Sequence, residues 1–215
     1  MEVNSRMNSL QQEHKEALAL DVSSVARQIQ AIGFHCMRCC ECCQGPDASV
    51  LAFPREVRAL SSLTGLSWAE VAEPPQRGEF DRQGNFHTLE WRLVKSGPDC
   101  RFYSDGCCSV YPCRPLLCRT YPFYLANGEL QVSECRGLGQ SMEPEAAADL
   151  AAMLKERYLI ELEEGRELLS RFRDFSRGRP SVDGCCIVHD SEGEHRHSWE
   201  DWPGLRERVM EVYGL

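Results

Sequence analysis

The sequence predicts an α+β fold: a small, irregular, metal-stapled domain with short strands, an N-terminal helix and a long helix in the C-terminal half of the chain. Three observations support this prediction. The chain holds 13 cysteines among 215 residues, well above ordinary usage. Apolar residues recur at helical spacing in two long stretches. Between these stretches lie short segments with strand patterns and turn signals.

Two stretches predict the main helices. In residues 10–32 the apolar positions recur mostly at threes and fours, and Gly33 is a typical helix end. Residues 144–175 are rich in Ala, Leu, Glu and Arg at helical spacing, which predicts one long packing helix, loosened at Gly165. Shorter helices are predicted after Pro54, at residues 67–72 and at residues 205–213.

The remaining local patterns predict strands and turns. Residues 49–53 predict a short strand, and the alternation of apolar and polar residues over 86–94 predicts another. Residues 74–85 carry prolines and glycines among charges, which is typical of a loop. Asn127 and Gly128 predict a β-hairpin, because both turn positions favour residues that tolerate positive φ.

These elements suggest four segments in one compact unit. Residues 1–33 would form a helix that packs on the core, and residues 34–140 would form a cysteine-cluster metal-binding domain. Residues 141–180 would form the long helix, and residues 181–215 a C-terminal extension with a short helix.

Composition and charge exclude several classes of protein. The formal charge of −9 and the pI near 5.2, without a basic block, predict no nucleic-acid partner. No stretch approaches the ~20 apolar residues that cross a bilayer, so no membrane partner is expected. The N-terminus lacks the pattern of an export signal, which predicts a cytoplasmic protein. In a reducing compartment, clustered thiols are expected to bind metal or to do redox chemistry.

The first cysteine group has the spacing of metal ligands. Residues 34–45, FHCMRCCECCQG, contain C-x2-C-x2-C, and a C-x2-C turn suits Zn²⁺ or an iron–sulfur cluster. A ferredoxin pattern would need its fourth cysteine at Pro46, so further ligands must come from elsewhere in the chain. Cys36, Cys40 and Cys43 also have the C-x3-C-x2-C spacing of radical S-adenosylmethionine enzymes.

Adjacent cysteines raise a geometric question. In extended backbone, neighbouring side chains point to opposite sides, so Cys42 and Cys43 are expected to diverge toward two neighbouring centres or to serve one polynuclear centre. For Cys107 and Cys108, one is expected to be a ligand and the other a small buried hydrophobe.

Several motifs together resemble a known family. FHCMRCCECC at residues 34–43, CRFY at 100–103, CSVYPCRPLLCRTYPF at 108–123 and VSECRGLG at 132–139 are similar to the CxxCxxCC cysteine-cluster family of zinc- or iron-chelating domain proteins. The resemblance spans roughly residues 34–139 and keeps the motifs in the same order.

The resemblance implies eight metal ligands, which make two sets of four. They are Cys36, Cys39, Cys42, Cys43, Cys100, Cys108, Cys118 and Cys135. Cys40 stands where the family more often has glycine, and Cys107 could replace Cys108 if the loop is shifted by one residue. Cys113 has no assigned role.

Four other residues are candidates for supporting the metal or cofactor site. Arg114 and Arg119 flank Cys118 and could donate to thiolates, or act as surface charge or a structural clamp. Tyr111 and Tyr121 are expected to pack, with hydroxyls that reach the ligands or line a substrate pocket.

The C-terminal cysteines and histidines allow two interpretations. Cys185 and Cys186, followed by His189, His195 and His197, could form a separate zinc site. The histidine spacing matches no standard pattern, so an irregular, solvated tail without ligands is expected instead.

The predicted cofactor is an iron–sulfur cluster of the [4Fe–4S] type, because closely spaced and adjacent cysteines favour it, with zinc as the alternative. Three functions are compatible with this site. They are redox or substrate-modifying chemistry with a redox partner or a small-molecule or protein substrate, a zinc-stapled binding module, and a metal or redox sensor. No phosphate-binding loop, G-x-S-x-G elbow or H-E-x-x-H pair indicates another enzyme class.

Overall fold

The computed structural model describes residues 2–45, 49–171 and 175–214, and the α+β class is confirmed. The chain forms two compact units, each built from two stretches of sequence. Unit 1 comprises Met1–Cys40 and Leu116–Ser170, and unit 2 comprises Glu41–Pro115 and Arg171–Leu215. Within the described residues, none of the helices combines the length and the apolar character that crossing a membrane requires.

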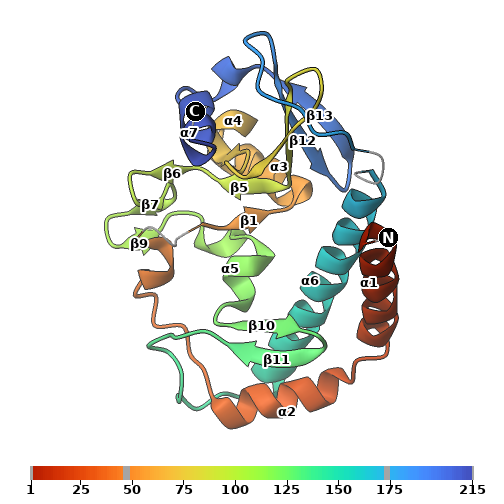
Figure 1. Cartoon of the computed structure of the whole chain (residues 1–215). Helices are drawn as coiled ribbons and strands as arrows, with labels where there is room; N and C mark the ends of the chain where they lie inside the picture. The colour runs from red at the N-terminus through yellow and green to blue at the C-terminus, as the bar shows by residue number, and fades with distance from the viewer. Residues whose placement is uncertain (1, 46–48, 172–174, 215) are drawn as a thin grey trace. The chain divides into compact units, whose positions relative to one another are not determined.

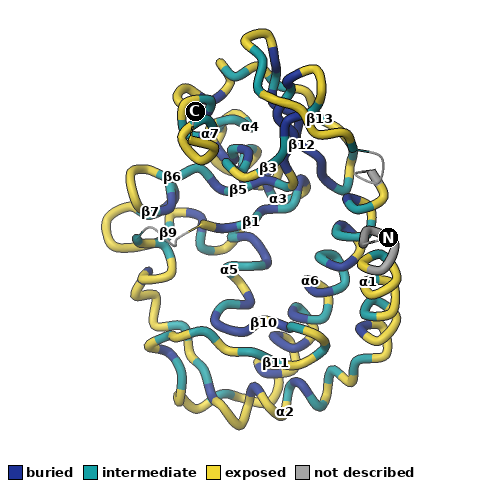
Figure 2. The backbone as a smooth tube through the Cα atoms, viewed as in Figure 1, coloured by how far each residue is buried: buried dark blue, intermediate teal, exposed yellow. Residues whose placement is uncertain are grey.

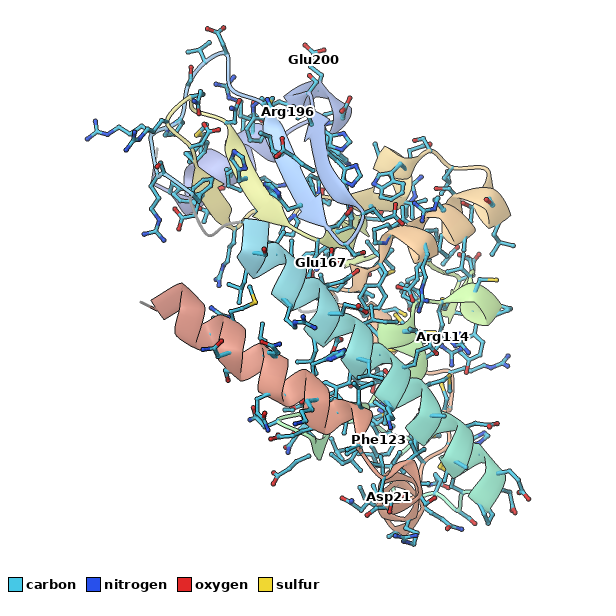
Figure 3. The ribbon with its side chains drawn as sticks, turned by 90° about the vertical axis from the view of Figure 1, so that its right-hand side faces the viewer. Asp21, Arg114, Phe123, Glu167, Arg196 and Glu200 are labelled. Carbon is cyan, nitrogen blue, oxygen red and sulfur yellow. The ribbon has the colours of Figure 1, made fainter. Side chains whose placement is uncertain are left out.

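Unit 1 consists of helices packed around one hairpin. Its elements are α1 (Glu2–Leu18), α2 (Val22–Ile32), α5 (Leu116–Thr120), α6 (Pro144–Arg171), β10 (Phe123–Ala126) and β11 (Glu129–Val132). Figures 1 and 3 show α1 lying along α6. The predicted turn is confirmed, because Asn127 and Gly128 have φ values of 52° and 76° between the paired strands.

The N-terminal helix differs from its prediction, because residues 10–32 contain a break. Asp21, labelled in Figure 3, has an extended conformation and accepts a hydrogen bond from the backbone N–H of Ser23 over 2.9 Å. It therefore caps a new helix, α2, which ends at Gly33 as expected. The long helix α6 is described as far as Arg171, and the predicted continuation over residues 172–174 lies outside the described part of the chain.

The core of unit 1 joins its four longer elements. Apolar side chains of α1, α2, α6 and the β10–β11 hairpin form one buried cluster. Its buried members are Ala17, Val25, Ile29, Phe123, Leu125, Ala147, Leu150, Ala151, Leu154, Tyr158 and Leu162. Phe34, directly before the cysteine loop, packs edge-on against Phe123, with ring centroids 5.7 Å apart. The cysteine loop therefore starts from a residue that the core fixes in place.

Unit 2 combines three helices with small sheets. Its helices are α3 (Pro54–Thr64), α4 (Trp68–Val71) and α7 (Leu205–Val212). Its strands are β1 (Leu51–Ala52), β2 (Ala72–Glu73), β3 (Gly78–Phe80), β4 (Phe86–Leu89), β5 (Trp91–Leu93), β6 (Lys95–Ser96), β7 (Asp99–Cys100), β8 (Tyr103–Ser104), β9 (Cys107–Cys108), β12 (Cys186–Asp190) and β13 (Gly193–His197). They form sheets of order β1-β5-β2 and β13-β12-β4-β3, and the hairpins β6-β7 and β8-β9.

The single strand predicted over residues 86–94 is wrong. The segment contains two strands, β4 and β5, which belong to different sheets. Glu90 between them has a φ of 65°, in the left-handed region, and its N–H donates to the carbonyl of His189 over 2.8 Å. The chain turns there, and the alternating pattern continues in the next sheet.

The C-terminal segment is not the irregular, solvated tail that its sequence suggested. All five residues of β12 are buried, as the dark tube in Figure 2 shows. The strand pairs antiparallel with β13 and parallel with β4, so it lies inside a four-stranded sheet. Its apolar partners come from a segment 100 residues earlier in the chain, which local pattern does not reveal.

Candidate metal centre

The cysteine-rich loop crosses the boundary between the two units. Unit 1 includes the loop as far as Cys40, and unit 2 begins at Glu41. The eight predicted ligands therefore divide into two sets of four. Set 1, in unit 1, is Cys36, Cys39, Cys118 and Cys135, and set 2, in unit 2, is Cys42, Cys43, Cys100 and Cys108.

Three thiols of set 2 are hydrogen-bonded to one another. The 3-10 turn η1 (Glu41–Cys43) allows Cys43 to bond with Cys42, and Cys43 also bonds with Cys108 from β9. The expectation that Cys42 and Cys43 diverge is therefore wrong, because it assumed extended backbone. Cys100 of β7 interacts electrostatically with the thiolate forms of this group. The structure thus brings the four members of set 2 together.

This contact changes the acidity of the set 2 thiols. Hydrogen bonding to Cys43 lowers the pKa of Cys42 to about 7 and the pKa of Cys108 to about 6. The pKa of Cys43 is raised, because its thiol bonds with Cys108 and Cys42 and is partly buried. Burial raises the pKa of Cys100. Set 2 therefore holds thiols that ionise easily beside thiols that keep their protons until a metal displaces them.

Arg114 lies close enough to set 2 to influence the charge of its thiols. Its positive charge helps to lower the pKa of Cys42 and Cys108. The guanidinium stacks on the ring of Tyr111, with Cζ 3.7 Å from the ring centroid, and Nη1 donates to the Tyr111 carbonyl over 3.0 Å. Figure 3 labels this arginine. Both interactions hold a permanent positive charge near thiols that would become negative on metal binding.

The segments that carry set 1 are joined by backbone contacts. Phe34 and Leu138 form a β-bridge, and the N–H of His35 donates to the carbonyl of Gly137 over 2.9 Å. The chain around Cys36 therefore lies beside the chain around Cys135.

The other contacts of this region fix Cys135 and the segment after Cys118. The N–H of Gly137 donates to the sulfur of Cys135 over 3.5 Å, a contact that would stabilise a thiolate. The Tyr121 hydroxyl donates to the Glu134 carbonyl, which ties the end of α5 to the residue before Cys135. Tyr121 therefore contacts the segment that carries Cys135, and its role at the metal site stays a prediction.

Arg119 is placed differently from its prediction as a thiolate donor. Its Nη2 lies 3.2 Å from the sulfur of Met153 on α6. Its guanidinium therefore contacts the long helix, which corresponds to the structural clamp that was the alternative interpretation.

Residues 35–137 match the family model CxxCxxCC, described as "Putative zinc- or iron-chelating domain". This stretch of the chain is therefore similar to the CxxCxxCC domain. The match includes every member of both sets, and it extends over parts of unit 1 and unit 2. No curated protein and no solved structure shows a significant match to the chain. Metal binding by zinc or iron is therefore the activity that the family description attaches to this domain.

Cys40 has a backbone conformation that glycine favours. Its φ is 56°, and Arg38 two residues earlier has a φ of 53°, so both occupy the left-handed region. L-residues pay roughly 1–2 kcal/mol for this conformation, whereas glycine does not. This explains physically why glycine suits the position. The Cys40 side chain is buried, 6% exposed.

Two cysteines of this region that are not predicted ligands differ from the hydrogen-bonded thiols of set 2. Cys107 and Cys113 are exposed, and the Cys107 sulfur lies 3.4 Å from the Ser104 carbonyl. Cys108, not Cys107, is the member of the adjacent pair that contacts Cys43. Neighbouring side chains of a strand point to opposite faces, so the two thiols of β9 lie on opposite sides of the strand.

The C-terminal cysteines and histidines belong to the four-stranded sheet. Cys186 is fully buried, and burial raises the pKa of its thiol to about 12. His189 contacts His87 over 2.8 Å, while His195 and His197 contact the carboxylates of Asp190 and Asp201. These contacts support the sheet, and a separate zinc site at these residues stays the less favoured of the two interpretations.

Neither set is a ready-made coordination sphere. Among residues 2–45, 49–171 and 175–214, no group of three or more His, Cys, Asp or Glu side chains is arranged to hold a metal ion as it stands. In set 2, the thiol of Cys43 bonds to the thiols of Cys42 and Cys108. Ligation would therefore require side-chain rotation at these cysteines. The donor chemistry, four sulfurs in one unit, fits zinc or an iron–sulfur cluster.

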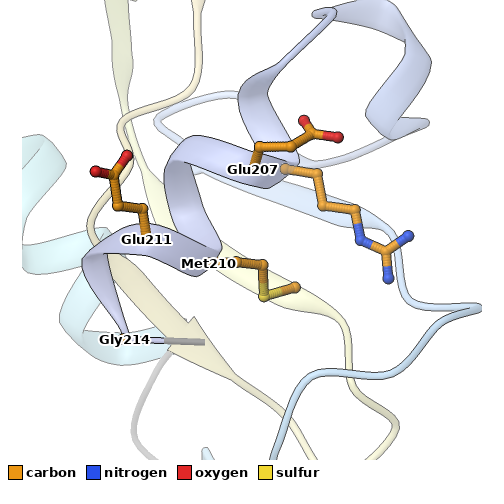
Figure 4. Close-up of a pocket in the computed structure, with 5 residues that line it drawn as sticks. Glu207, Met210, Glu211 and Gly214 are labelled. Carbon is orange, nitrogen blue, oxygen red and sulfur yellow. The ribbon is translucent and has the colours of Figure 1, made fainter.

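A surface pocket lies elsewhere in unit 2, on the C-terminal helix α7. Figure 4 shows it. It is lined by Arg206, Glu207, Met210, Glu211 and Gly214. None of the predicted ligands lines this pocket, so the pocket is not part of the cysteine site.

Sequence reasoning did not connect two polar residues, Lys95 and Asp99, with the ligand turn of set 2. Lys95 and Asp99 both contact the backbone of Gly45, directly after the ligand turn. The one sequence signal for Asp99 is its position next to Cys100. Lys95 carries no such signal, because it meets the loop through the pairing of β6 with β7.

Proposed function

We propose that the CxxCxxCC domain binds two metal centres, one in each unit, and that these centres are [4Fe–4S] clusters. The observation that carries the proposal is the division of the eight predicted ligands into four and four between the compact units. Four thiolates are the usual ligand number of this cluster.

The adjacency of Cys42 and Cys43 favours a polynuclear centre. In a mononuclear zinc site, both sulfurs would have to converge on one tetrahedral ion. In a cubane cluster each thiolate binds a different iron, so two neighbouring residues of a 3-10 turn need not aim at the same atom. The cluster is therefore the better geometric match to η1.

The proposed chemistry is redox or substrate modification. A [4Fe–4S] centre supplies one-electron transfer or, with an open coordination position, Lewis acidity. Cys39 of set 1 and Cys42 of set 2 are both exposed. An exposed ligand places one edge of each centre where a redox partner or a small-molecule or protein substrate could approach.

The thiols also support a reducing location. The cysteines of residues 34–45 have the spacing of metal ligands, which is more typical of thiols in a reducing compartment than of a disulfide framework. Proteins of oxidising compartments normally pair such a number of cysteines. We therefore propose a cytoplasmic protein.

Anaerobic purification with metal analysis tests the proposal. We expect a broad visible absorption and about eight iron and eight sulfide per chain, because each set would hold one cluster. A stable, colourless protein with two zinc ions and no sulfide would overturn the cluster and support the zinc-stapled module, which the family description also allows. Protein that binds neither metal would overturn metal binding itself.

A sensor function is the remaining candidate, and the exposed thiols Cys107 and Cys113 favour it. Reactive, accessible cysteines are the residues that redox sensors oxidise. Mild oxidation of the metal-loaded protein should then modify these two thiols before any metal is released. Simultaneous metal loss and thiol modification would argue against a separate sensing role.

A further inference from the structure

Gly45 lies two residues after the η1 turn that carries Cys42 and Cys43, and side chains bind both backbone polar groups of this glycine. The N–H of Gly45 donates to Oδ1 of Asp99 over 2.8 Å. The carbonyl of Gly45 accepts from Nζ of Lys95 over 3.1 Å. Both contacts are partly buried, so water competes with them less than at an open surface. One residue of the loop is therefore held at two points.

Both tethering side chains come from the hairpin that carries another predicted ligand. In the β6–β7 pair, Lys95 lies opposite Cys100 and Ser96 lies opposite Asp99. Asp99 also directly precedes Cys100 in sequence. The two contacts therefore fix the η1 turn against the strand of Cys100 rather than against a distant part of unit 2.

Gly45 itself suits this attachment. Its φ is 88°, in the left-handed region, and among the described residues, its chain neighbours aside, no atom lies within 4 Å of the position where a Cβ would stand. The backbone, and not a side chain, is what the hairpin recognises. An acceptor for the N–H and a donor for the carbonyl, supplied by one hairpin, form a two-point clamp.

We propose that Lys95 and Asp99 are positioning residues of the set 2 centre, which hold the Cys42–Cys43 turn beside Cys100 before metal binds. This inference rests on the proposed function. A loop that is already held loses less conformational freedom when its thiolates close on a metal. Residues that support metal ligands in this way typically change metal affinity 10–100-fold when they are replaced.

The contact chemistry makes a sharp test possible. In Asp99→Asn the amide oxygen can still accept from the Gly45 N–H, whereas in Asp99→Ala no acceptor remains. Likewise Lys95→Arg keeps a donor and a positive charge, and Lys95→Met keeps the length of the side chain without either. Each disruptive variant therefore has a conservative partner at the same position.

The experiment is a titration of the metal-free full-length chain with Co²⁺ alone, followed by the thiolate-to-cobalt absorption. We expect Asp99→Ala to lower the affinity for about half of the bound Co²⁺ by tenfold or more, because set 2 loses its clamp. The affinity for the other half, bound by set 1, should stay unchanged. Asp99→Asn should bind like the wild type. Equal affinities in Asp99→Ala and the wild type, or equal loss in Asp99→Asn and Asp99→Ala, would overturn the positioning role.

A second measurement separates this inference from the proposed function and from misfolding. In the metal-free wild type, the Gly45 amide should exchange hydrogen at least tenfold more slowly than in Asp99→Ala, while amides of α3 should exchange alike in both. Equal exchange at Gly45 would overturn the clamp even if metal binds. If the amide is protected but the wild type forms no thiolate–cobalt absorption, the proposed function fails, and the positioning role fails with it.

Discussion

Cys43 and Cys108 are hydrogen-bonded through their side chains, although one lies in the η1 turn and the other in strand β9. The contact selects one member of the adjacent pair Cys107 and Cys108, because the other thiol is exposed and lies near the Ser104 carbonyl. It also places two parts of the CxxCxxCC motif set in direct contact within unit 2.

The first prediction uses this adjacent pair as its own control. Cys108→Ser should abolish the set 2 centre, so the metal content per chain should fall by about half, because a serine oxygen is a poor ligand for a soft thiolate site. Cys107→Ser should retain the full metal content. The measurement is metal and sulfide analysis of anaerobically purified variants. Half loss in Cys107→Ser with full content in Cys108→Ser would reverse the assignment.

A second prediction concerns Cys40. Cys40→Gly should keep both centres and change the free energy of unfolding by no more than about 1 kcal/mol, since relief of the left-handed conformation offsets the lost side-chain burial. Cys40→Val should cost about 2 kcal/mol or more, because β-branched residues tolerate positive φ poorly. Denaturant unfolding and metal analysis give both quantities. Metal loss in Cys40→Gly would show that Cys40 is a ligand.

A third prediction tests a buried contact of unit 2. Nε1 of Trp91 donates to Oδ2 of Asp190 over 2.7 Å, and both residues are 1% exposed. Trp91→Phe should lower the free energy of unfolding by about 2–4 kcal/mol, because it removes a donor from a buried carboxylate and leaves a cavity.

Trp68→Phe is the matched control for this change. Among the described residues, Nε1 of Trp68 has no hydrogen-bond partner, so the same replacement removes no bond. It should therefore cost less than Trp91→Phe in denaturant unfolding. Equal costs would mean that packing, and not the bond to Asp190, dominates at Trp91.

Local signals in the sequence were sufficient for some elements. The turn at Asn127 and Gly128 was predictable because two adjacent residues that tolerate positive φ determine it. The helical pattern from Pro144 was predictable because it is long and its apolar face is continuous. The eight candidate ligands came from the family resemblance, and their roles stay predictions.

Other features depend on partners that are distant in sequence. β12 is buried because β4, from a distant part of the chain, pairs with it, so its burial was missed. The contact of Cys42 with Cys43 depends on a 3-10 turn, where the sequence argument assumed extended backbone. The clamp at Gly45 depends on the register of the β6–β7 hairpin. Single-residue patterns do not encode such registers.

The last prediction concerns the acid stability of unit 2. The Asp81 carboxylate is 15% exposed and accepts hydrogen bonds from Asn85 and from Nε2 of His87, the latter over 2.9 Å. Burial raises the pKa of Asp81, but these hydrogen bonds outweigh it and hold the pKa at about 2, below the ordinary 3.8. The folded pKa is depressed, so its stabilisation is present above about pH 4 and is lost as the pH falls to about 2.

Asp81→Asn should therefore lower the free energy of unfolding at pH 7 by about 1–2 kcal/mol, and its difference from the wild type should shrink as the pH falls from 4 to 2. Tryptophan fluorescence in urea measures this, because all four tryptophans, Trp68, Trp91, Trp199 and Trp202, lie in unit 2. Both proteins would be stripped of metal first, so that acid release of metal does not enter the difference.

Asp183→Asn, at an exposed position of the same unit, should behave like the wild type throughout. If the difference in the free energy of unfolding between Asp81→Asn and the wild type stayed constant from pH 7 to pH 2, the contacts of Asp81 would stabilise the fold through packing and not through its charge.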